Sequence, residues 1–586
     1  MVRGPDLTAP APDPAPADRL DSLRRAAEAT PDRPAGWNAL GIALAQAKRA
    51  EDAAEAFRRT IAADPAYARG HNNLGNALQQ LGRKQDALAC YDRALECDPS
   101  YGDARENRIR LRLASDDKSG AINDLRLLAQ RSAPGDVSAQ ARIFRLGVEC
   151  ARWDIAAQAA RRLTRLRPDD VEAWRMLAQA EQNQGNQTSL LAARRRIAFL
   201  DPARKESQIA LGQSLLRCGE PLEARFVLED ATRRWPEDAD AWYWLGNACI
   251  RLEQHGTAQA CYRKVAALED PAKRAHFAEA TTLIQQGDWT KGWALYDGRY
   301  GLSAFKPRIP VSRVGLWRGE ALTGKTILIH AEQGFGDTIM AARFLPLLKD
   351  RFGAARVELL AEKELRPLLQ PLACLDAFHP VGEKQSFAFH RHLPMLSLPQ
   401  RCGALPDDLP NAPYLAAPAG KPRPDWADDP RLKIGIVWAG RPTHSDDRYR
   451  SIALRQLAPV MTDPKRLVVS LQMGQARNAL AVDRLAQRAN LIDHGRVVRD
   501  FGDSAAAIAA LDLLITVDTA AAHLAGAMGK PVWMLLSMGA EWRWGFQGKT
   551  TPWYPSMRLY RQRPLADWEE VMERLMADLR SWHPAA

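Results

Sequence analysis

The first half of the chain repeats one pattern of apolar and small residues every 34 positions. The marked positions of one unit recur in the next, from Trp37, Leu40, Gly41, Leu44, Ala53, Phe57 and Pro65 to His71, Leu74, Gly75, Leu78, Ala87, Tyr91 and Pro99. Apolar residues three and four positions apart indicate helices with one buried face. The proline at the end of each unit stops its second helix. We therefore expect pairs of helices that stack on their neighbours.

This period and its marker positions are typical of tetratricopeptide repeats, which form an α-solenoid. The spacing continues at further prolines, namely Pro168, Pro202 and Pro236, although the pattern is degraded between about 101 and 168. We expect the solenoid over residues 19–300, after a proline-rich disordered leader over residues 1–18. Small residues such as Gly41 should let paired helices approach closely, and aromatic residues such as Phe57 should fill the gap between neighbouring repeats.

One face of the solenoid is expected to bind a protein acceptor. In tetratricopeptide proteins the first helix of each pair lines a concave groove, so positions five and nine after the tryptophan site face inward. These rows read Ile42, Asn76, Gln179, Gln213 and Asn247, and Gln46, Gln80, Asn183, Arg217 and Arg251. Amide groups can bond to a peptide backbone whatever its side chains, so the amides of both rows suit an extended polypeptide. The alternative is that they are solvated helix positions chosen for solubility.

After Thr323 the pattern changes to short apolar runs that alternate with helical segments, which predicts a parallel α/β fold. The runs expected to be strands are 326–330, 357–360, 434–438, 467–471, 513–517 and 532–536. A linker rich in proline and aspartate, residues 418–430, separates them into two groups. We therefore expect two Rossmann-like domains, over residues 301–425 and 426–586, with a ligand cleft at the carboxyl ends of their strands.

Four loops should meet in this cleft, and the first runs from Gly334 to Asp337, before a helix expected over 338–349. Gly336 would permit the close approach of a ligand. Asp337 has two interpretations. As a general base it would accept the proton of an acceptor hydroxyl. As an N-cap it would accept hydrogen bonds from the first backbone N–H groups of the helix.

The second loop, residues 439–451, carries a cluster of polar side chains that includes Arg441, His444, Arg448, Arg450 and Ser451. Arginines at the end of a buried strand can bind phosphate oxygens in a bidentate manner. The alternative is a solvated run of mixed charge, because Asp446 and Asp447 lie among the basic residues. The third loop contributes Gln472, which follows a strand and alone indicates little.

The fourth loop holds Asp518 and Thr519 at the end of a strand, followed by His523. We expect Asp518 and Thr519 to cap a helix whose N-terminus points into the cleft and attracts a phosphate. His523 lies one turn into this helix and would bond to the same ligand. The alternative for His523 is a packed core histidine.

Composition narrows the class of function. The chain has 586 residues, of which 46% are hydrophobic, and a formal net charge of +11. This charge could suit nucleic acid, an anionic membrane face or a phosphorylated small molecule, and nucleic acid fits least well because basic and acidic residues alternate along the repeats. The sequence lacks a Gly-x-Gly-x-x-Gly motif, a P-loop and a Gly-x-Ser-x-Gly motif, which argues against dehydrogenases, NTPases and α/β-hydrolases. Its eight cysteines contain no Cys-x-x-Cys pair, and no apolar run approaches the roughly 20 residues of a membrane span. We expect a cytoplasmic protein that needs neither a metal nor a cofactor.

Several segments of the second half resemble bacterial tetratricopeptide-linked glycosyltransferases, which have a GT-B fold related to the heptosyltransferases and share the layout of O-GlcNAc transferase. The segments are 334–337, 437–442, 447–452, 470–472, 518–526, 542–544 and 552–555. The domain order and length are similar to those of the flagellin glycosyltransferases of stalked bacteria, whose repeats bind flagellin and whose catalytic half attaches a nonulosonic acid. By the same resemblance, a last helix expected over 568–582 should cross back onto the first sheet.

The resemblance implies a metal-independent protein O-glycosyltransferase that uses a nucleotide sugar as cosubstrate and flagellin as acceptor. It places the catalytic base on Asp337. Contacts to the donor nucleotide and diphosphate fall on Asp518, Thr519 and His523, while Ala520 replaces a glycine of the heptosyltransferases and bears on which donor is used. Donor binding is further expected of Gly336, Arg441, His444, Arg448, Arg450, Ser451 and Gln472. Two alternatives remain open: a glycan or lipid-linked acceptor, and an inactive transferase-like scaffold or chaperone.

Overall fold

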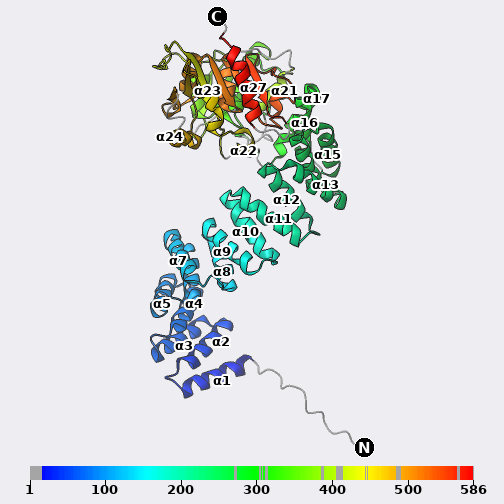
Figure 1. Ribbon diagram of the computed structural model, residues 1–586. Coiled ribbons are helices and arrows are strands. Elements are labelled where there is room, and N and C mark those ends of the chain that lie inside the picture. The colour runs from blue at the N-terminus through cyan, green and yellow to red at the C-terminus, as the bar shows by residue number, and fades with distance from the viewer. Residues whose placement is uncertain are drawn as a thin grey trace, which may run out of the picture. The chain divides into compact units, whose positions relative to one another are not determined.

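The structure is a computed structural model in which the chain forms two compact units, Met1–Ser207 and Gln208–Ala586 (Figure 1). It describes residues 16–584 except 270–272, 303–304, 306–307, 310–314, 384–387, 404, 406–412, 443, 445–446, 484–489 and 564–567. The first described helix begins at Pro16, inside the expected leader, and the rest of that leader lies outside the described residues.

The first unit is built from successive helices that pack in pairs, such as α2 with α3 and α4 with α5. Its helices are α1 (Pro16–Ala29), α2 (Pro34–Gln46), α3 (Ala50–Ala63), α4 (Ala68–Gln80), α5 (Lys84–Cys97), α6 (Gly102–Leu113), α7 (Lys118–Arg131), α8 (Val137–Glu149), α9 (Trp153–Leu166), α10 (Val171–Gln184) and α11 (Gln187–Leu200). The predicted α-solenoid is confirmed. The stretch with a degraded sequence pattern, about 101 to 168, also forms helix pairs, α6 to α9.

The repeating prolines have a structural partner six residues further on. In five repeats the side chain at that position donates an N–H to the proline carbonyl oxygen at 2.6–3.1 Å. The pairs are Trp37 with Pro31, His71 with Pro65, Arg105 with Pro99, Trp174 with Pro168, and Trp242 with Pro236. Each of these prolines lies two residues after the end of one helix, and its carbonyl oxygen accepts a hydrogen bond from a side chain in the first turns of the next helix.

The glycines of the repeats face aromatic rings of the same repeat. A Cβ atom at Gly41 would lie 2.5 Å from the ring of Phe57, and one at Gly75 would lie 2.5 Å from the ring of Tyr91. Both distances are too short for a non-bonded contact, so a residue with a Cβ atom does not fit at either position. The ring therefore packs between the two helices of its own repeat, whereas the sequence pattern suggested the gap between neighbouring repeats. The glycine is needed because it leaves room for that ring.

The second unit contains further solenoid helices and continues into an α/β half. The helices are α12 (Lys205–Cys218), which contains the boundary between the units, α13 (Pro221–Arg234), α14 (Ala239–Arg251), α15 (His255–Leu268), α16 (Lys273–Gln285) and α17 (Trp289–Tyr296). A 3₁₀ helix, η1 (Asp297–Gly301), follows α17 and packs on α16.

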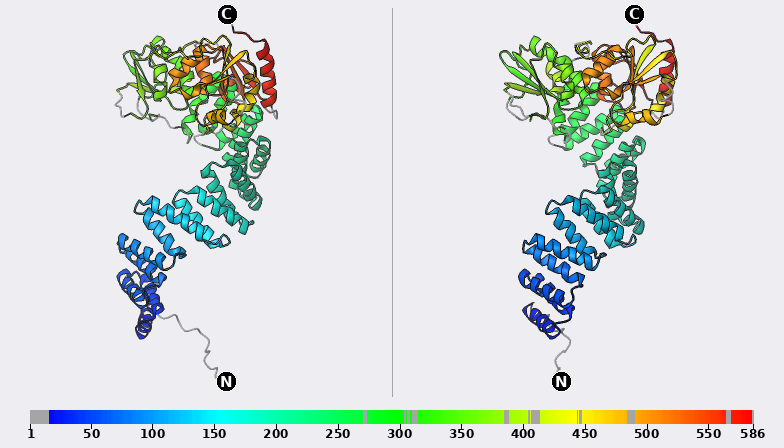
Figure 2. Two further views of the ribbon diagram at one scale, coloured as in Figure 1. Left: turned by 60° about the vertical axis from the view of Figure 1, so that its left-hand side comes forward. Right: turned by 90° about the vertical axis from the view of Figure 1, so that its left-hand side faces the viewer.

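The α/β half holds two sheets in which neighbouring strands pair in parallel, and Figure 2 shows them as separate groups of strands. The first has the order β3-β2-β1-β4 and the second β10-β9-β8-β5-β6-β7. The strands are β1 (Thr326–His330), β2 (Arg356–Ala361), β3 (Ala377–Pro380), β4 (Arg391–Pro394), β5 (Leu432–Val437), β6 (Arg466–Ser470), β7 (Leu491–Asp493), β8 (Leu513–Val517), β9 (Val532–Leu536) and β10 (Met557–Arg561). Numbered within itself, the second sheet has the Rossmann order 3-2-1-4-5-6, and the first has its 3-2-1-4 part. The prediction of two Rossmann-like domains is confirmed.

The helices of this half differ from the expected ones in two places. They are α18 (Phe335–Ala341), α19 (Leu345–Asp350), α20 (Arg366–Leu369), α21 (Leu398–Cys402), α22 (Asp447–Arg450), α23 (Ala458–Met461), α24 (Ala479–Val482), α25 (Phe501–Ala510), α26 (Ala520–Ala527) and α27 (Trp568–Ser581). The helix expected over 338–349 starts earlier and is interrupted, because Pro346 cannot donate the backbone hydrogen bond that would continue it. The helix α27 buries Val571 and Leu575 in a cluster with β5 and β8, so it packs on the second sheet and the expected crossing to the first sheet is wrong.

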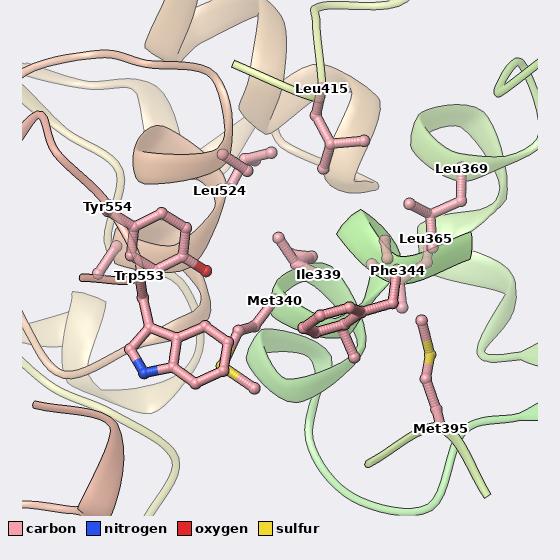
Figure 3. Packing of buried hydrophobic residues seen from close by; sticks show 14 of the residues in the cluster. Ile339, Met340, Phe344, Leu365, Leu369, Met395, Leu415, Leu524, Trp553 and Tyr554 are labelled. Atoms are coloured by element: carbon pink, nitrogen blue, oxygen red, sulfur yellow. The ribbon is translucent and has the colours of Figure 1, made fainter. Parts of the chain in front are cut away.

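One hydrophobic core joins the last repeat to both Rossmann-like domains. It includes Trp289 and Trp293 of α17, Met340 of the first domain, and Leu524 and Trp553 of the second. Figure 3 shows side chains of the two domains meeting in this cluster. The end of the solenoid is therefore part of the same folding unit as the α/β half. None of the helices that the structure describes combines the length and apolarity needed to cross a lipid bilayer.

This shared core predicts where the chain can be cut. A chain that starts at Arg204 keeps α12 to α17 whole, whereas one that starts at Gly301 loses three aromatic residues, Trp289, Trp293 and Tyr296, which pack on Trp542 and Trp553. Removing one buried aromatic side chain costs about 3–5 kcal/mol, so the shorter chain should lose cooperative folding. Thermal melts followed by circular dichroism check this. Equal melting temperatures of the two chains would contradict it.

Candidate functional site

The candidate site lies where the strand order of each sheet reverses, the usual ligand position of such folds. In the first sheet this point is between β1 and β4, and α18 follows β1 there. In the second sheet it is between β5 and β8. Residues 438–442 and His444 follow β5, and Asp518 with Thr519 follows β8. The helices α18 and α26, which start at these two points, pack on each other.

Asp337 is the third residue of α18 and not its N-cap. The N-cap is Gly334, whose backbone N–H donates to Asp337 Oδ2 at 2.9 Å. Asp337 thus stabilises the start of the helix by accepting the N–H of the N-cap residue, as the acidic residue of a capping box does. Its side chain is 18% exposed.

The second carboxylate oxygen of Asp337 pairs with Arg543, a residue that the sequence analysis did not single out. Arg543 lies in the 3₁₀ helix η9 (Trp542–Trp544) after β9, and it is 5% exposed. Its guanidinium group donates to Asp337 and also to Glu541. One buried cation therefore links α18 of the first domain to the loop 537–541 of the second. In the sequence, only the resemblance of the segment 542–544 to tetratricopeptide-linked glycosyltransferases points to Arg543.

The three carboxyl groups around Arg543 have shifted pKa values. Burial raises the pKa of Asp337 above its usual value, against the opposing charge of Arg543. Burial also raises the pKa of Asp518, and the negative charge of Glu541 raises it further. For Glu541 burial acts in the same direction, but the charges of Arg543, His444 and Arg450 outweigh it and lower the pKa. Glu541 is therefore the carboxylate that stays ionised most easily.

His523 occupies the contact between the two domains. It is 5% exposed, and a Cβ atom at Gly336 would lie 2.6 Å from its ring, so glycine is required at that position. Its Nδ1 atom bonds to the hydroxyl of Tyr554 at 2.9 Å. Burial and the charges of Arg543 and Arg343 lower the pKa of His523 well below its usual value. The ring is therefore neutral at pH 7.

Asp518 and Thr519 bond differently from the expected capping pair. Asp518 Oδ2 accepts a hydrogen bond from Trp544 Nε1 at 3.0 Å. Thr519 has the extended backbone of an N-cap, but its hydroxyl bonds to Thr516 Oγ1 at 3.1 Å. The expectation that these side chains cap α26 is therefore corrected, and Asp518 instead faces the residues around Arg543.

The side chains of the basic loop differ in exposure. Arg450 is 18% exposed and lies 3.5 Å from Asp447, which in turn accepts a hydrogen bond from Ser451 Oγ at 2.9 Å. His444 Nε2 lies 3.9 Å from Glu541. Arg441 and Arg448 are exposed. Of the four predicted basic residues, the fold therefore brings His444 and Arg450 to the site.

Gln472 holds the loop after β5 in place. Its Oε1 atom accepts hydrogen bonds from the backbone N–H groups of Trp438 (3.0 Å) and Ala439 (2.9 Å). Its Nε2 atom donates to the carbonyl oxygens of Ala439 and Met473. These four bonds use the full capacity of the amide. In this structure Gln472 supports the basic loop, and donor binding by its side chain stays a prediction.

Two cavities adjoin these residues. A small one is lined by Arg251, His444, Arg450, Asp518, Ser537 and Glu541, among others. A larger cavity of about 510 Å³ lies between the last repeat and the loop after β9. Its walls include Gln285, Trp289, Trp542, Arg543 and Trp544. The described residues contain no group of three or more histidine, cysteine, aspartate or glutamate side chains that could hold a metal ion.

The amide residues predicted to bind an acceptor fall into two groups. Asn76 and Asn247 are partly buried, and each accepts a hydrogen bond through Oδ1 from a tyrosine of its own repeat, Tyr91 at 2.7 Å and Tyr262 at 2.9 Å. Gln179 and Asn183 are exposed, and Gln213 is partly buried. Further asparagines, absent from the prediction, bond from repeat to repeat, as Asn73 does with Asn38 and Asn107 with Asn72.

Comparison with known proteins supports the class that this fold and site define, a tetratricopeptide-repeat protein with a paired Rossmann-like half. Models of the tetratricopeptide repeat match residues 68–101 and residues 19–68, 151–202 and 209–258. A curated relative is Protein FlbA of Caulobacter vibrioides, which is 26% identical over 443 residues, covering 71% of this chain and 74% of the relative. This match agrees with the resemblance to bacterial tetratricopeptide-linked glycosyltransferases stated from the motifs.

Two solved structures match parts of the chain. YrrB, described as a tetratricopeptide protein with an unusual peptide-binding site, is 21% identical and covers 32% of this chain and 96% of its own, with a TM-score of 0.26. MamA is 20% identical and covers 27% of this chain and 91% of its own, with a TM-score of 0.25.

Buried histidines should make the protein less stable in acid. Burial, with the nearby His392, lowers the pKa of His330 to about 3. The unfolded chain takes up this proton at the usual pKa of 6.5, so the free energy of unfolding should fall as the pH drops below that value. By pH 5, His330 alone should lower the free energy of unfolding by about 2 kcal/mol. Urea unfolding of wild type and His330→Gln at pH 7.5 and pH 5 should show a smaller loss in the variant. An equal loss in both proteins would argue against a buried neutral His330.

Proposed function

We propose that this protein is a glycosyltransferase that transfers a sugar from a nucleotide donor to a protein hydroxyl. The observation that carries the proposal is the meeting of Asp337, Asp518 and His523. These residues were predicted from separate loops of two domains, and they converge on Arg543 and Trp544. The repeats supply a surface for a protein acceptor. The fold alone would not be sufficient, because Rossmann-like domains serve many reactions.

Asp337 is the proposed general base. It would accept the proton of the acceptor hydroxyl, whose oxygen then bonds to the anomeric carbon while the bond from that carbon to the donor phosphate breaks. The nucleotide leaves with the electron pair of the broken bond. The raised pKa of Asp337 favours this role, because a carboxylate of higher pKa binds a proton more strongly. Arg450 and His444 would stabilise the negative charge of the leaving phosphate.

The acceptor is proposed to be flagellin, held as an extended segment by the repeats, and the transferred sugar a nonulosonic acid. Both follow from the resemblance of the domain order and length to those of flagellin glycosyltransferases. The cavity beside Trp542 and Trp544 supports a path for the acceptor, because its wall includes both the last repeat and Arg543, the partner of Asp337. Recognition of the acceptor would then begin on the repeats and end at Asp337.

The base assignment predicts the effect of Asp337→Asn on sugar transfer. The amide oxygen can still accept the N–H of Gly334, but the side chain cannot take a proton, so the rate at saturating donor should fall by about 10²–10⁴. Arg543 keeps Glu541 as a partner, so stability should fall by only about 1.5–3 kcal/mol, the range for a hydrogen bond to a charged group. Intact-mass measurement of co-incubated flagellin reports the rate, and thermal melts report stability.

Glu541→Gln is the matched control, because it removes the other carboxylate partner of Arg543 and leaves Asp337 in place. An equal loss of transfer in both variants would show that Asp337 acts by positioning Arg543. In the wild type the rate should fall as the pH drops through the raised pKa of Asp337, since only the ionised form accepts a proton. Asp337→Asn with the wild-type rate would refute the catalytic assignment.

An inactive scaffold is the second candidate, and the ion pair between Asp337 and Arg543 favours it, because that pair occupies the proposed base. The two candidates differ in one measurement. A scaffold would bind flagellin tightly and leave its mass unchanged with every nucleotide sugar tried, whereas the transferase would add the mass of one sugar at each modified residue.

The exposed amides give a test of acceptor binding that leaves the fold intact. Gln179→Ala combined with Asn183→Ala should weaken flagellin binding about tenfold, as the loss of two neutral hydrogen bonds of about 0.5–1.5 kcal/mol each would do. Gln158→Ala, an exposed amide on the second helix of its pair, is the matched control. Calorimetry measures the affinity of each variant. Unchanged binding by the double variant would leave these positions as solvated surface.

A further inference from the structure

The larger cavity of the second unit, of about 510 Å³, has one wall from the repeats and one from the loop after β9. The repeat wall comes from the start of α15, the end of α16 and the start of α17, through His255, residues 284–287 and Trp289. The loop wall consists of residues 542–547, Thr550 and Pro552. Ligand sites have volumes of about 300–1,000 Å³, so this cavity is large enough to hold part of a ligand such as a peptide or a sugar.

The loop wall is held in shape by contacts within the protein. Arg561, the last residue of β10, donates to carbonyl oxygens along this loop, namely those of Trp544, Gly545, Gln547 and Gly548. The ring of Phe546 stacks on that of His255, with the ring planes 20° apart, and so joins the two walls. A wall that is already ordered loses little conformational entropy when a ligand binds, which favours binding.

The lining of this cavity is largely apolar and carries little net charge. Its apolar side chains are those of Ile284, Trp289, Trp542, Trp544, Phe546 and Pro552. Of the lining residues that the structure describes, Arg543 alone has a permanent charge, and Asp337 and Glu541 already pair with it. Burial lowers the pKa of His255, so its ring is neutral at pH 7. A neutral ligand therefore fits this cavity better than the charged phosphates of a nucleotide donor.

One hydrogen-bond donor in the cavity wall has no partner. The side chain of Arg543 is 5% exposed, and its Nε atom makes no hydrogen bond to any residue that the structure describes. Leaving a buried N–H group unpaired is unfavourable, so a ligand with an oxygen acceptor would be stabilised there. Nε and Nη2 lie on the same edge of the planar guanidinium group, and Nη2 donates to Asp337. An oxygen bound to Nε would therefore lie beside the carboxylate of the proposed base.

A polypeptide meets these requirements better than a sugar does. Its backbone supplies a carbonyl oxygen for Arg543 Nε, and an aromatic or large aliphatic side chain would pack against the indole rings of the lining. A sugar needs partners for several hydroxyl groups, but two lining amides are already engaged. Gln285 Nε2 donates to the carbonyl oxygen of Ala540 at 2.7 Å, and Gln286 Oε1 accepts a hydrogen bond from Gln259 at 2.6 Å.

We propose that this cavity binds the acceptor polypeptide next to the hydroxyl that is modified, with one aromatic or large aliphatic side chain inside it and a backbone carbonyl oxygen on Arg543 Nε. The proposal rests on the function proposed above and deepens it, because it gives the acceptor a sequence requirement close to the modified serine or threonine. The repeat wall of the cavity continues the surface proposed to hold the acceptor. The bond to Arg543 would bring the neighbouring hydroxyl towards Asp337.

The test fills the cavity with a side chain of the protein itself. Gln547 and Thr550 are exposed lining residues, whereas Lys549, between them, is exposed and outside the lining. Gln547→Trp and Thr550→Trp should each lower the affinity of the full chain for N-acetyl-tryptophanamide, measured by NMR titration, at least about tenfold, as the lost burial of one aromatic side chain implies. Calorimetry should show that both variants also bind flagellin more weakly. Lys549→Trp is the matched control and should equal the wild type in both measurements.

Different results overturn different statements. Equal affinities of the wild type and both filling variants for N-acetyl-tryptophanamide, or no binding by the wild type, would refute the side-chain site and leave the proposed transfer standing. Tighter binding of a methyl glucoside, lost in the filling variants, would make the occupant a sugar and the proposal wrong. Unchanged binding of flagellin by both variants would refute the acceptor as occupant. Flagellin that binds as expected but gains no mass with any nucleotide sugar would refute the transfer and leave the binding site standing. Thermal melts of both variants check that they are folded.

Discussion

The candidate site depends on the buried positive charge of Arg543. A charge that is 5% exposed must be paired, and its partners Asp337 and Glu541 belong to different Rossmann-like domains. Moving α18 away would leave Arg543 with one carboxylate fewer in a poorly solvated environment, which is costly. The relative position of the two domains at the cleft is therefore constrained by electrostatics as well as by the hydrophobic core they share. A ligand or a proton that changes this balance would act on both domains at once.

A second buried arginine links the end of the solenoid to the loops around the cleft. Arg299 follows the last repeat helix and is fully buried. It donates to Glu332 after β1 at 2.9 and 3.2 Å and to Ser397 after β4 at 2.7 Å. These residues lie at the point where the order of the first sheet reverses, so the end of the solenoid is bonded directly to the loops that shape the cleft. The end of the solenoid therefore helps to hold the loops of the cleft in place.

The sequence predicted those parts of the fold that depend on local patterns. Long apolar runs predicted β1, β2, β5, β6, β8 and β9 to within about two residues. The strands β3, β4, β7 and β10 were missed because they are short or only partly buried, as the three partly exposed residues of β7 illustrate. Their place in the sheet is decided by neighbouring strands, which a local pattern does not contain.

The residues of the candidate site could likewise be predicted only where a local pattern marks them. Asp337, Asp518 and His523 could be found because each follows the end of a strand, where ligands of parallel sheets bind. Arg543 was not found as a site residue, because its partner is far away in the sequence. Arg543 bonds to a residue 206 positions away. No period or spacing encodes such pairs, so they emerge only when the chain is folded.

The bond between each proline carbonyl and the side chain six residues later gives the solenoid a particular tolerance to change. Tryptophan, histidine and arginine all make this bond, so the geometry of the joint requires a long side chain with an N–H group and not one residue type. Because the joint fixes the angle between successive helices independently of the exposed residues, the polar rows of the repeats can vary while the spacing of the helices stays constant. Such an array could acquire a new protein partner by surface substitutions alone, with the α/β half left untouched.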